Sequence, residues 1–407
     1  MFKSTQTGPV AGTTPQRAGR FTGAVVAALA LVAISACGSD ATSSVATSSV
    51  ATSSVATSSV ATGSSGSSSD GGTAALVDKA KKQVEELGRL DNVKLPTPPD
   101  SFSPGKHKLA IVTAGQAGGA KTMGDFSAQA AKAMGWDSQI FDGKYTAAGQ
   151  AAALSQADTN GFDAVVMTAV NPSAVKAQID ALIAKGVPIA CYECAQAGAQ
   201  PFPQIIQVGD NGKTGELMQW VVIAETGGKG NVIVFDDKTF PIVDLRATSL
   251  IDGLKANCAQ CKTKRVDTPT SDIGVPGPPA WSAALAADPT VTWGAGPYDA
   301  LTKQMADTVT QLGIKAGVNG YDGDPAVIQE IGKGGPLKST IGGAYEYLSW
   351  AGVDLVARAL AHAKMWDASA MPTRIVTAAN WKDFASGSWV PTGFSLQDTF
   401  AKSWGKK

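Results

Sequence analysis

Apolar residues recur with two alternating periods along most of the chain, and this predicts strands and helices in turn. Each short, continuously apolar run is followed by a longer segment with helical spacing. Runs that are apolar throughout are typical of parallel strands covered on both faces. In a first series we expect strands at 108–115, 138–143, 162–170 and 187–193, with helices at 124–136, 148–160 and 172–186.

A second series of the same kind begins near 205–209. Two consecutive series of similar size predict an α/β protein with two lobes and a cleft between them. Ligands of open parallel sheets bind at the carboxyl ends of the strands, so the residues just after each strand are the candidate contacts. The second series has expected helices at 212–227, 241–257, 280–289 and 298–313 and expected strands at 231–237, 262–269, 290–296 and 315–323.

The first 36 residues predict a secretory signal peptide that takes no part in the fold. Basic residues precede an apolar run at 21–36, which is too short to span a bilayer. The run ends in Ile-Ser-Ala-Cys at 34–37, which resembles a bacterial lipobox. That resemblance implies that Cys37 becomes the first mature residue and carries lipid. An ordinary signal peptide followed by a chance cysteine is the alternative.

The segment that follows predicts a tether. Residues 41–72 contain four copies of Ala-Thr-Ser-Ser-Val and then mainly Ser and Gly. Such a composition has too little apolar surface to offset its chain entropy, so we expect disorder and a reach of roughly 30 Å. An amphipathic helix is expected at 73–90, followed by a Pro-rich connector at 94–106.

Composition excludes several classes of function. Lysines and arginines number 34, as do aspartates and glutamates, so no basic surface for nucleic acid is implied. His107 and His362 are the only histidines, which argues against histidine-rich metal sites and a Ser-His or Cys-His nucleophile. We therefore expect no enzyme, no bound cofactor and a monomeric body.

Over 106–407 the order of motifs resembles the type I periplasmic binding proteins, specifically the ribose-binding-like, sugar-type solute receptors of ABC importers. The resemblance implies an α/β fold with two doubly wound parallel-sheet lobes joined by a three-crossover hinge. The implied N-terminal lobe is 106–208 plus 343–376, and the implied C-terminal lobe is 209–342 plus 377–407, with a last crossing near 375–379. The segments that carry the resemblance are 142–157, 162–189, 208–218, 228–235, 285–301, 318–342 and 353–362.

The chain departs from the sugar-binding pattern of that family at two places. After the first strand, where the family has Asn-Pro-Phe-Phe, the segment around Gln116 and Gly119 has only small residues and no stacking rings. Its open backbone amides at a helix N-terminus would suit an anion or a bulkier ligand, and a rim without any contact is equally open. At the end of the fourth strand, Glu193-Cys194 stands where the family has Asp-Arg, so a carboxylate is kept and the bidentate guanidinium is lost. Tyr192 and Glu193 are the candidate contacts there.

Other candidate contacts lie in the second lobe. Arg246 is two residues early relative to the family's arginine, so it could face the cleft or pair on the surface with Asp244 or Asp252. The resemblance further implies ligand contacts from a set of residues that follow strands, although the aromatic ones could instead belong to the core. These are Phe240, Tyr298, Asp299, Asp322 and Tyr345.

Two Cys-x-x-Cys pairs, Cys191 with Cys194 and Cys258 with Cys261, raise three possibilities. A shared zinc site is disfavoured because the predicted fold puts one pair beside the cleft and the other at the far end of a second-lobe helix. A redox couple needs a helix after its first cysteine, and 195–203 does not have that pattern. Local disulfides are the default outside the cytoplasm, for the first pair only if its Cα atoms come within about 7 Å.

The function implied is capture of a small-molecule ligand by cleft closure and its delivery to ABC permease transmembrane subunits, with the protein held to the membrane by its lipid anchor. The ligand is a sugar by family default, and a carboxylate or aromatic compound is the alternative. A receptor that signals to a membrane partner remains a competing interpretation. No Walker loop, nucleophile elbow or zinc-protease motif supports an enzyme.

Overall fold

The computed structural model describes residues 68–194, 204–209, 213–368 and 372–406. The described residues belong to one compact unit. The predicted signal peptide, the lipidation site Cys37 and nearly all of the predicted tether lie outside the described residues. In the described part, no helix combines the length and apolar character needed to cross a bilayer.

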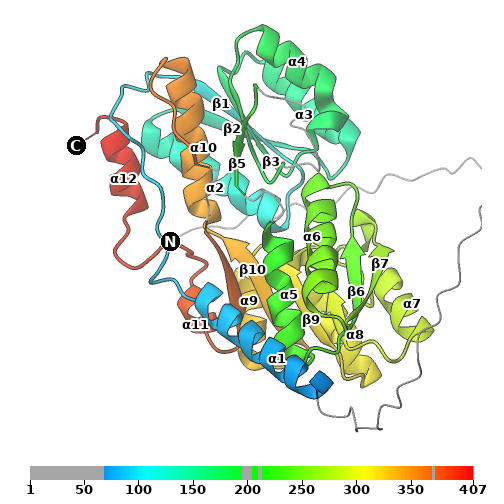
Figure 1. Cartoon of the computed structure of the whole chain (residues 1–407). Helices are drawn as coiled ribbons and strands as arrows, with labels where there is room; N and C mark the ends of the chain where they lie inside the picture. Colours follow the sequence, from blue (N-terminus) through cyan, green and yellow to red (C-terminus); the bar gives the residue numbers. More distant parts are fainter. Residues whose placement is uncertain (1–67, 195–203, 210–212, 369–371, 407) are drawn as a thin grey trace, which may run out of the picture. The chain divides into compact units, whose positions relative to one another are not determined.

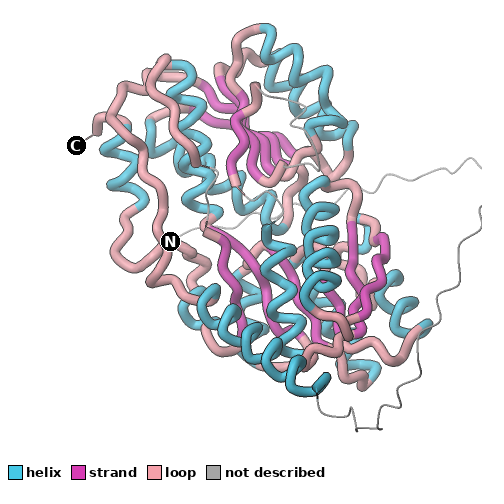
Figure 2. Tube along the Cα trace, viewed as in Figure 1, coloured by secondary structure: helices cyan, strands magenta, loops and turns pink. Residues whose placement is uncertain are grey.

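The first lobe is built on a parallel sheet in the order β2-β1-β3-β4-β5 (Figures 1 and 2). Successive residues of β1 point to opposite faces, with Leu109 and Ile111 in one core and Ala110 and Val112 in the other. Helices α2 (Gly118–Met134) and α10 (Tyr345–Leu360) cover the first face, and α3 (Ala147–Thr159) and α4 (Lys176–Ala184) cover the second. The strands are β1 (Lys108–Thr113), β2 (Asp137–Asp142), β3 (Ala164–Thr168), β4 (Ile189–Tyr192) and β5 (Ile206–Val208).

The second lobe contains a six-stranded sheet in the order β11-β10-β9-β8-β6-β7, parallel except for the antiparallel pair β10–β11. Helices α5 (Lys213–Glu225) and α6 (Pro241–Asn257) cover one face, and α7 (Pro279–Ala287), α8 (Asp299–Leu312) and α9 (Pro325–Lys333) cover the other. The strands are β6 (Asn231–Asp236), β7 (Lys262–Asp267), β8 (Trp293–Ala295), β9 (Gly317–Tyr321), β10 (Leu337–Gly343) and β11 (Thr373–Thr377). The predicted fold class, α/β with two parallel-sheet lobes, is confirmed.

The lobe boundaries differ from the predicted ones at two points. Strand β11 pairs with β10, so 373–377 belongs to the second sheet, and the chain returns to that sheet between α10 and β11 rather than at 375–379. Helix α12 (Leu396–Ser403) lies on the first lobe, where Trp404 stacks on Trp350 of α10 at 5.6 Å. Local periodicity cannot show which sheet edge a short strand will join or which apolar face a short helix will cover.

The expected N-terminal helix is present as α1 (Ser68–Leu87), and it is an integral part of the second lobe. It packs along α5, with Ala80 fully buried in the same core as Met218 and Val222 (Figure 1). The connector that follows is fastened to the first lobe, where Tyr347 donates to the carbonyl of Pro96 at 2.5 Å. The chain therefore enters the folded body through the second lobe.

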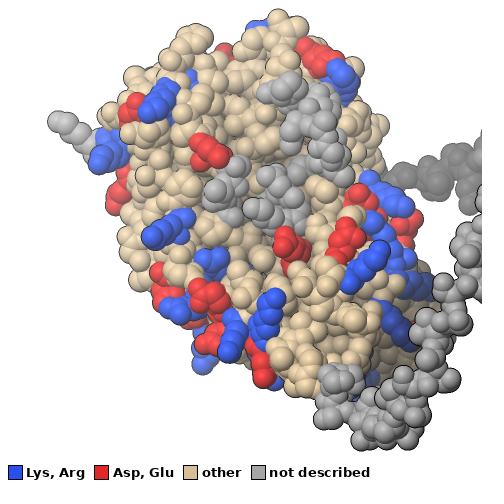
Figure 3. All heavy atoms as spheres, viewed as in Figure 1, with Lys and Arg blue, Asp and Glu red and all other residues tan. Residues whose placement is uncertain are grey.

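Charged residues are interspersed on the face drawn in Figure 3, where basic and acidic side chains alternate among the described residues. Three exposed ion pairs of the described residues are i, i+4 pairs along single helices, such as Lys303 with Asp307 at 2.7 Å. Exposed pairs of this kind contribute little to stability and serve mainly solubility.

Candidate ligand-binding site

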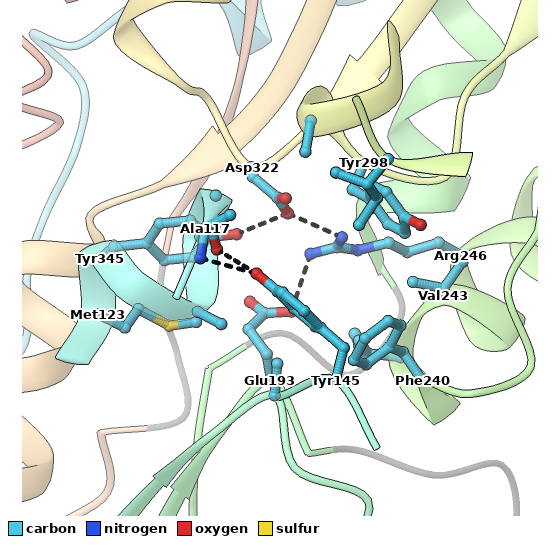
Figure 4. A pocket seen from close by; sticks show the side chains of 17 residues that line it. Ala117, Met123, Tyr145, Glu193, Phe240, Val243, Arg246, Tyr298, Asp322 and Tyr345 are labelled. Atoms are coloured by element: carbon cyan, nitrogen blue, oxygen red, sulfur yellow. Dashed lines mark hydrogen bonds and ion pairs between the residues drawn. The ribbon is translucent and has the colours of Figure 1, made fainter. Parts of the chain in front are cut away.

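A pocket lies where the carboxyl ends of strands from both sheets meet (Figure 4). Glu193 directly follows β4 of the first sheet, and Asp322 directly follows β9 of the second. The convergence follows from parallel topology, because all strands of one sheet present their carboxyl ends at one edge. The residues that line the pocket are Ala117, Gly118, Gly119, Ala120, Met123, Tyr145, Ala169, Glu193, Phe240, Ile242, Val243, Arg246, Ile273, Tyr298, Ala300, Asp322 and Tyr345.

The guanidinium of Arg246 joins two carboxylates across this pocket. Its Nη2 donates to Glu193 Oε2 at 2.8 Å, and its Nη1 donates to Asp322 Oδ1 at 3.0 Å. Both ends of the Arg246–Glu193 pair are 4% exposed. Charge-assisted hydrogen bonds of this kind are strong where water is excluded, and losing one partner leaves a buried charge without compensation.

Arg246 therefore supplies the guanidinium that the Glu193-Cys194 sequence lacks, and it comes from the opposite lobe. Surface pairing with Asp244 was the alternative, but Asp244 is engaged by Arg265 at 2.5 Å. Arg265 also donates to Asp236 at 2.8 Å, away from the pocket. Asp244 is thus paired with Arg265, whereas Arg246 turns inward to Glu193 and Asp322.

Carboxyl groups at the second-lobe side of the pocket are held in an environment that favours their neutral form. Burial raises the pKa of Asp322, an effect that Arg246 partly offsets. Burial also raises the pKa of Asp299 well above its usual range, and the charge of Asp322 adds to that shift. Tyr345 donates to Asp322 Oδ1 at 3.2 Å, and burial raises the pKa of that phenol well above its usual range. Burial is thus the main cause of the raised pKa of all three groups.

Aromatic side chains form the opposite wall. Phe240 meets Tyr145 and Tyr298 edge to face, with ring centroids 6.2 Å apart in both pairs. The Tyr145–Phe240 contact joins the two lobes, because Tyr145 follows β2 and Phe240 precedes α6. Ile242, Val243 and Ile273 complete this wall. The pocket thus has both charged and apolar parts: Figure 4 shows the Arg246 guanidinium between Asp322 and Glu193, with Phe240 and Val243 to the right.

The free space in this conformation is about 60 Å³. That is room for a few water molecules, since one water needs about 10–15 Å³ on this measure. A sugar-sized ligand therefore requires Arg246 to release a carboxylate or the two lobes to separate. The structure shows the pocket with its polar groups bonded to one another.

Of the ten predicted contact residues, the structure brings seven to the pocket: Gly119, Glu193, Phe240, Arg246, Tyr298, Asp322 and Tyr345. Gln116 is exposed and donates to Thr113 at 2.7 Å, and it does not line the pocket. Tyr192 points the other way because it is the last residue of β4. Its ring is fully buried against α10, and its hydroxyl donates to the carbonyl of Ser349 at 3.1 Å.

Asp299 supports the site without lining the pocket. Its Oδ2 accepts from the amide of Asp324 at 2.8 Å, and Thr340 donates to its carboxylate at 2.9 Å. These bonds fix the loop that begins with Asp322. Asp299 directly follows Tyr298 in the sequence, and the fold separates the two by turning Tyr298 into the pocket and Asp299 behind it.

Tyr145 was missed by the sequence analysis. It lies three residues beyond β2, with φ of 53°, and its hydroxyl both donates to the carbonyl and accepts from the amide of Ala117, each at 2.8 Å. It thereby holds the small-residue segment that precedes α2. Tyr145 comes two residues after the strand predicted at 138–143, so the expectation that contacts follow strands applies to it as well.

Both Cys-x-x-Cys pairs form local disulfides, with Cα–Cα distances of 5.8 Å for Cys191–Cys194 and 5.3 Å for Cys258–Cys261. The predicted pairing is confirmed in the structure. The first closes beside the pocket, and the second lies at the end of α6. Within the described ranges, no group of three or more His, Cys, Asp or Glu residues is placed to hold a metal.

Comparison with known proteins agrees with this architecture. The family described as "Periplasmic binding protein domain" matches residues 110–364, well over half of the chain. The chain therefore belongs to the periplasmic binding protein family, and its sheet topology is that of the type I members. No curated protein matches it.

Solved structures share the fold at low sequence identity. A solute-binding protein of an ABC transporter from Agrobacterium vitis, bound to α-D-tagatopyranose, has 15% identity and a TM-score of 0.63, covering 70% of this chain and 99% of its own. A Bacillus halodurans solute-binding protein with myo-inositol has 14% identity and a TM-score of 0.61, covering 70% and 99%. A Thermotoga lettingae 5-methylthioribose transporter protein has 15% identity and a TM-score of 0.61, covering 74% and 94%.

Proposed function

We propose that this protein is an extracytoplasmic receptor that captures a small polyhydroxylated ligand between its lobes and delivers it to an ABC permease. The observation that carries the proposal is the cross-lobe triad of Glu193, Arg246 and Asp322. Carboxylates accept hydrogen bonds from hydroxyls, and a guanidinium donates to them in a fixed fork. A ligand that exchanges with the internal bonds of the triad would contact both lobes and so favour closure.

The N-terminal sequence supports membrane attachment as part of this proposal. Lipid on Cys37, followed by the repetitive tether of 41–72, would hold the folded body near its permease. Metabolic labelling with a palmitate analogue should label the wild-type protein and not Cys37→Ala. Label retained on Cys37→Ala would contradict lipidation at Cys37 and would leave the proposed ligand binding unaffected.

Calorimetric titration tests ligand binding directly. The ligands are D-tagatose, D-ribose, D-galactose, allitol, myo-inositol and glycerol, each with wild type and with Arg246→Met. We expect at least one to bind wild type and to lose at least about tenfold in affinity with the variant, because two carboxylates then face the ligand without a cation. Arg265→Gln is the matched control, since that arginine also holds two carboxylates but lies outside the pocket. Consumption of a bound compound at catalytic protein concentration would overturn the receptor function.

The apolar wall favours a ligand that has a hydrocarbon, thioether or aromatic end. Phe240, Val243 and Tyr298 offer no free polar group at that end beyond the Tyr298 hydroxyl, which donates to Asp237 at 3.3 Å. Burying a methylthio group there should contribute about 1.4 kcal/mol, or roughly tenfold in affinity. Titration of 5-methylthioribose against ribose measures this, and equal or weaker binding of the thioether would exclude the apolar-ended ligand while leaving the receptor proposal intact.

A further inference from the structure

Glu193 lies between the two half-cystines of the Cys191–Cys194 disulfide, and its backbone is in the left-handed region with φ of 54°. That conformation is unfavourable for a residue with a Cβ by roughly 1–2 kcal/mol, and glutamate lacks the short side chain that makes asparagine tolerant of it. Something other than the preference of Glu193 must therefore hold the chain in this turn.

The residues on either side of Glu193 are anchored on opposite faces of the sheet. Tyr192 is buried against α10, and its carbonyl accepts from the amide of Ala169 at 2.9 Å. Cys191 and Cys194 are both buried in the core on the α3 and α4 side, at 0% and 2% exposure. The chain can bring Cys194 back to the face of Cys191 only by reversing at Glu193.

This reversal directs the glutamate side chain away from both cores and into the pocket. There Oε2 meets Arg246 Nη2 at 2.8 Å, the ion pair that joins the lobes. An ion pair of that length is lost when one group shifts by about 1 Å, since hydrogen bonds weaken steeply beyond 3.2 Å. The position of the Glu193 carboxylate relative to Arg246 thus depends on the conformation of the four-residue loop Cys191–Cys194.

The Cys258–Cys261 disulfide has the same spacing and makes no such connection. Cys258 ends α6, and the two residues that its loop encloses, Ala259 and Gln260, are exposed. Neither end of that loop contributes to the lining of the pocket. It is a matched control within the same chain, identical in bond type and loop length.

We propose that the Cys191–Cys194 disulfide is a positioning element of the binding site, which holds Glu193 in the left-handed turn required for its cross-lobe ion pair with Arg246. The proposal goes beyond the receptor function and requires no ligand for its test. It makes the disulfide responsible for geometry at the pocket, in addition to any contribution to stability.

The test is a double-mutant cycle of Glu193→Gln and Arg246→Gln, measured by urea unfolding in three backgrounds. The backgrounds are the intact chain, Cys191→Ala/Cys194→Ala, and Cys258→Ala/Cys261→Ala. In the intact chain we expect the cycle to give a coupling of at least about tenfold in the unfolding equilibrium constant, or 1.4 kcal/mol. The coupling should fall to less than about threefold without Cys191–Cys194 and keep its full size without Cys258–Cys261.

A purely structural disulfide would lower stability in both alanine backgrounds and leave the coupling unchanged, and that result would overturn the proposal. Equal loss of coupling in both backgrounds would also overturn it, because the control loop does not touch the pocket. If the double alanine variant does not fold, Cys191→Val/Cys194→Ala restores the lost core volume and is carried through the same cycle. Absence of coupling in the intact chain would refute the ion pair itself.

Discussion

Arg246 and Arg358 are both buried, at 3% and 0% exposure, and both pair with carboxylates. They differ in what they join, because Arg358 bonds within one lobe and Arg246 bonds across two. Arg358 lies in α10, where its Nε donates to Asp354 at 2.7 Å. Its other nitrogens bond to Ser403 at 2.8 Å and to the carbonyls of Asp100 and Lys364. It thereby fastens the N-terminal connector and α12 to a single lobe.

Arg246 instead joins two lobes that the proposed function requires to separate. Its partners, Glu193 and Asp322, follow strands of different sheets. The chemistry of the two arginines is nearly the same, so chemistry alone does not distinguish a structural from a functional buried ion pair. The difference is whether the elements that the pair joins can move apart.

Arg358→Met should give the largest effect. It leaves Asp354 fully buried without its cation, which costs about 3–5 kcal/mol of unfolding free energy. Urea unfolding of wild type and variant measures the loss, and affinity for any ligand found by titration should be unchanged. A stability change below about 1 kcal/mol would remove the basis for calling this arginine structural.

Arg246→Met should lower ligand affinity strongly and stability less than Arg358→Met does. We expect a loss of about 1–3 kcal/mol in unfolding free energy, smaller than for Arg358→Met, because the carboxylates freed at the pocket can regain water when the lobes part. Ligand affinity should fall at least about tenfold. If stability falls as far as for Arg358→Met, Arg246 belongs to the rigid core and the comparison fails.

The pH dependence of stability sharpens the comparison at the pocket. The pKa of Asp299 is about 3.8 in the unfolded chain and is raised well above that value in the folded protein. Between these two pKa values the folded protein keeps a proton on Asp299 that the unfolded chain has lost. Its stabilising effect is complete below the unfolded pKa and is lost as pH rises toward the folded pKa, with a slope of at most about 1.4 kcal/mol per pH unit.

Asp299→Asn should remove this slope. Urea unfolding at a series of pH values above about 4 should show a steeper decline for wild type than for the variant. Asp322, whose pKa is also raised, is present in both proteins, so the difference between the curves reports Asp299 together with its coupling to Asp322. Parallel curves would show that Asp299 is not held in its neutral form.

Tyr145→Phe should give the smallest effect. The variant removes a hydroxyl that bonds twice to the backbone of Ala117 and leaves the ring contact with Phe240 in place. We expect a loss of about 0.5–1.5 kcal/mol in unfolding free energy and a weaker ligand affinity. Tyr347→Phe, which loses a hydroxyl bond to Pro96 far from the pocket, should lower stability without changing affinity.

Much of the fold could be predicted because it follows from local pattern. Strands β1–β4 and β6–β9 and helices α1–α8 were placed by apolar periodicity and by Gly and Pro at their ends. The placement of β11 and α12 could not be predicted in this way, since a short strand pairs with whichever edge is available and a short amphipathic helix covers whichever apolar face is left. Seven of the ten predicted contact residues line the pocket because contacts follow strand ends in parallel sheets.

The predicted contacts that lie outside the pocket differ from the others in the direction of their side chains rather than in their position along the chain. Tyr192 and Glu193 are adjacent, yet one is core and the other faces the pocket, because β4 ends between them and the chain reverses. Gln116 turns back onto Thr113. A sequence gives the order of residues after a strand, but the backbone turn decides which of them points inward.

The sequence by itself determined that this chain forms two α/β lobes, that its candidate contacts follow strands, and that no arginine accompanies Glu193 in the usual position. These properties could be predicted because they depend on apolar periodicity and residue type, which are local features of the sequence. Only the tertiary structure decided that Arg246 restores the guanidinium from the opposite lobe. An ion pair between residues 53 positions apart depends on how two sheets face each other, and no local pattern carries that information.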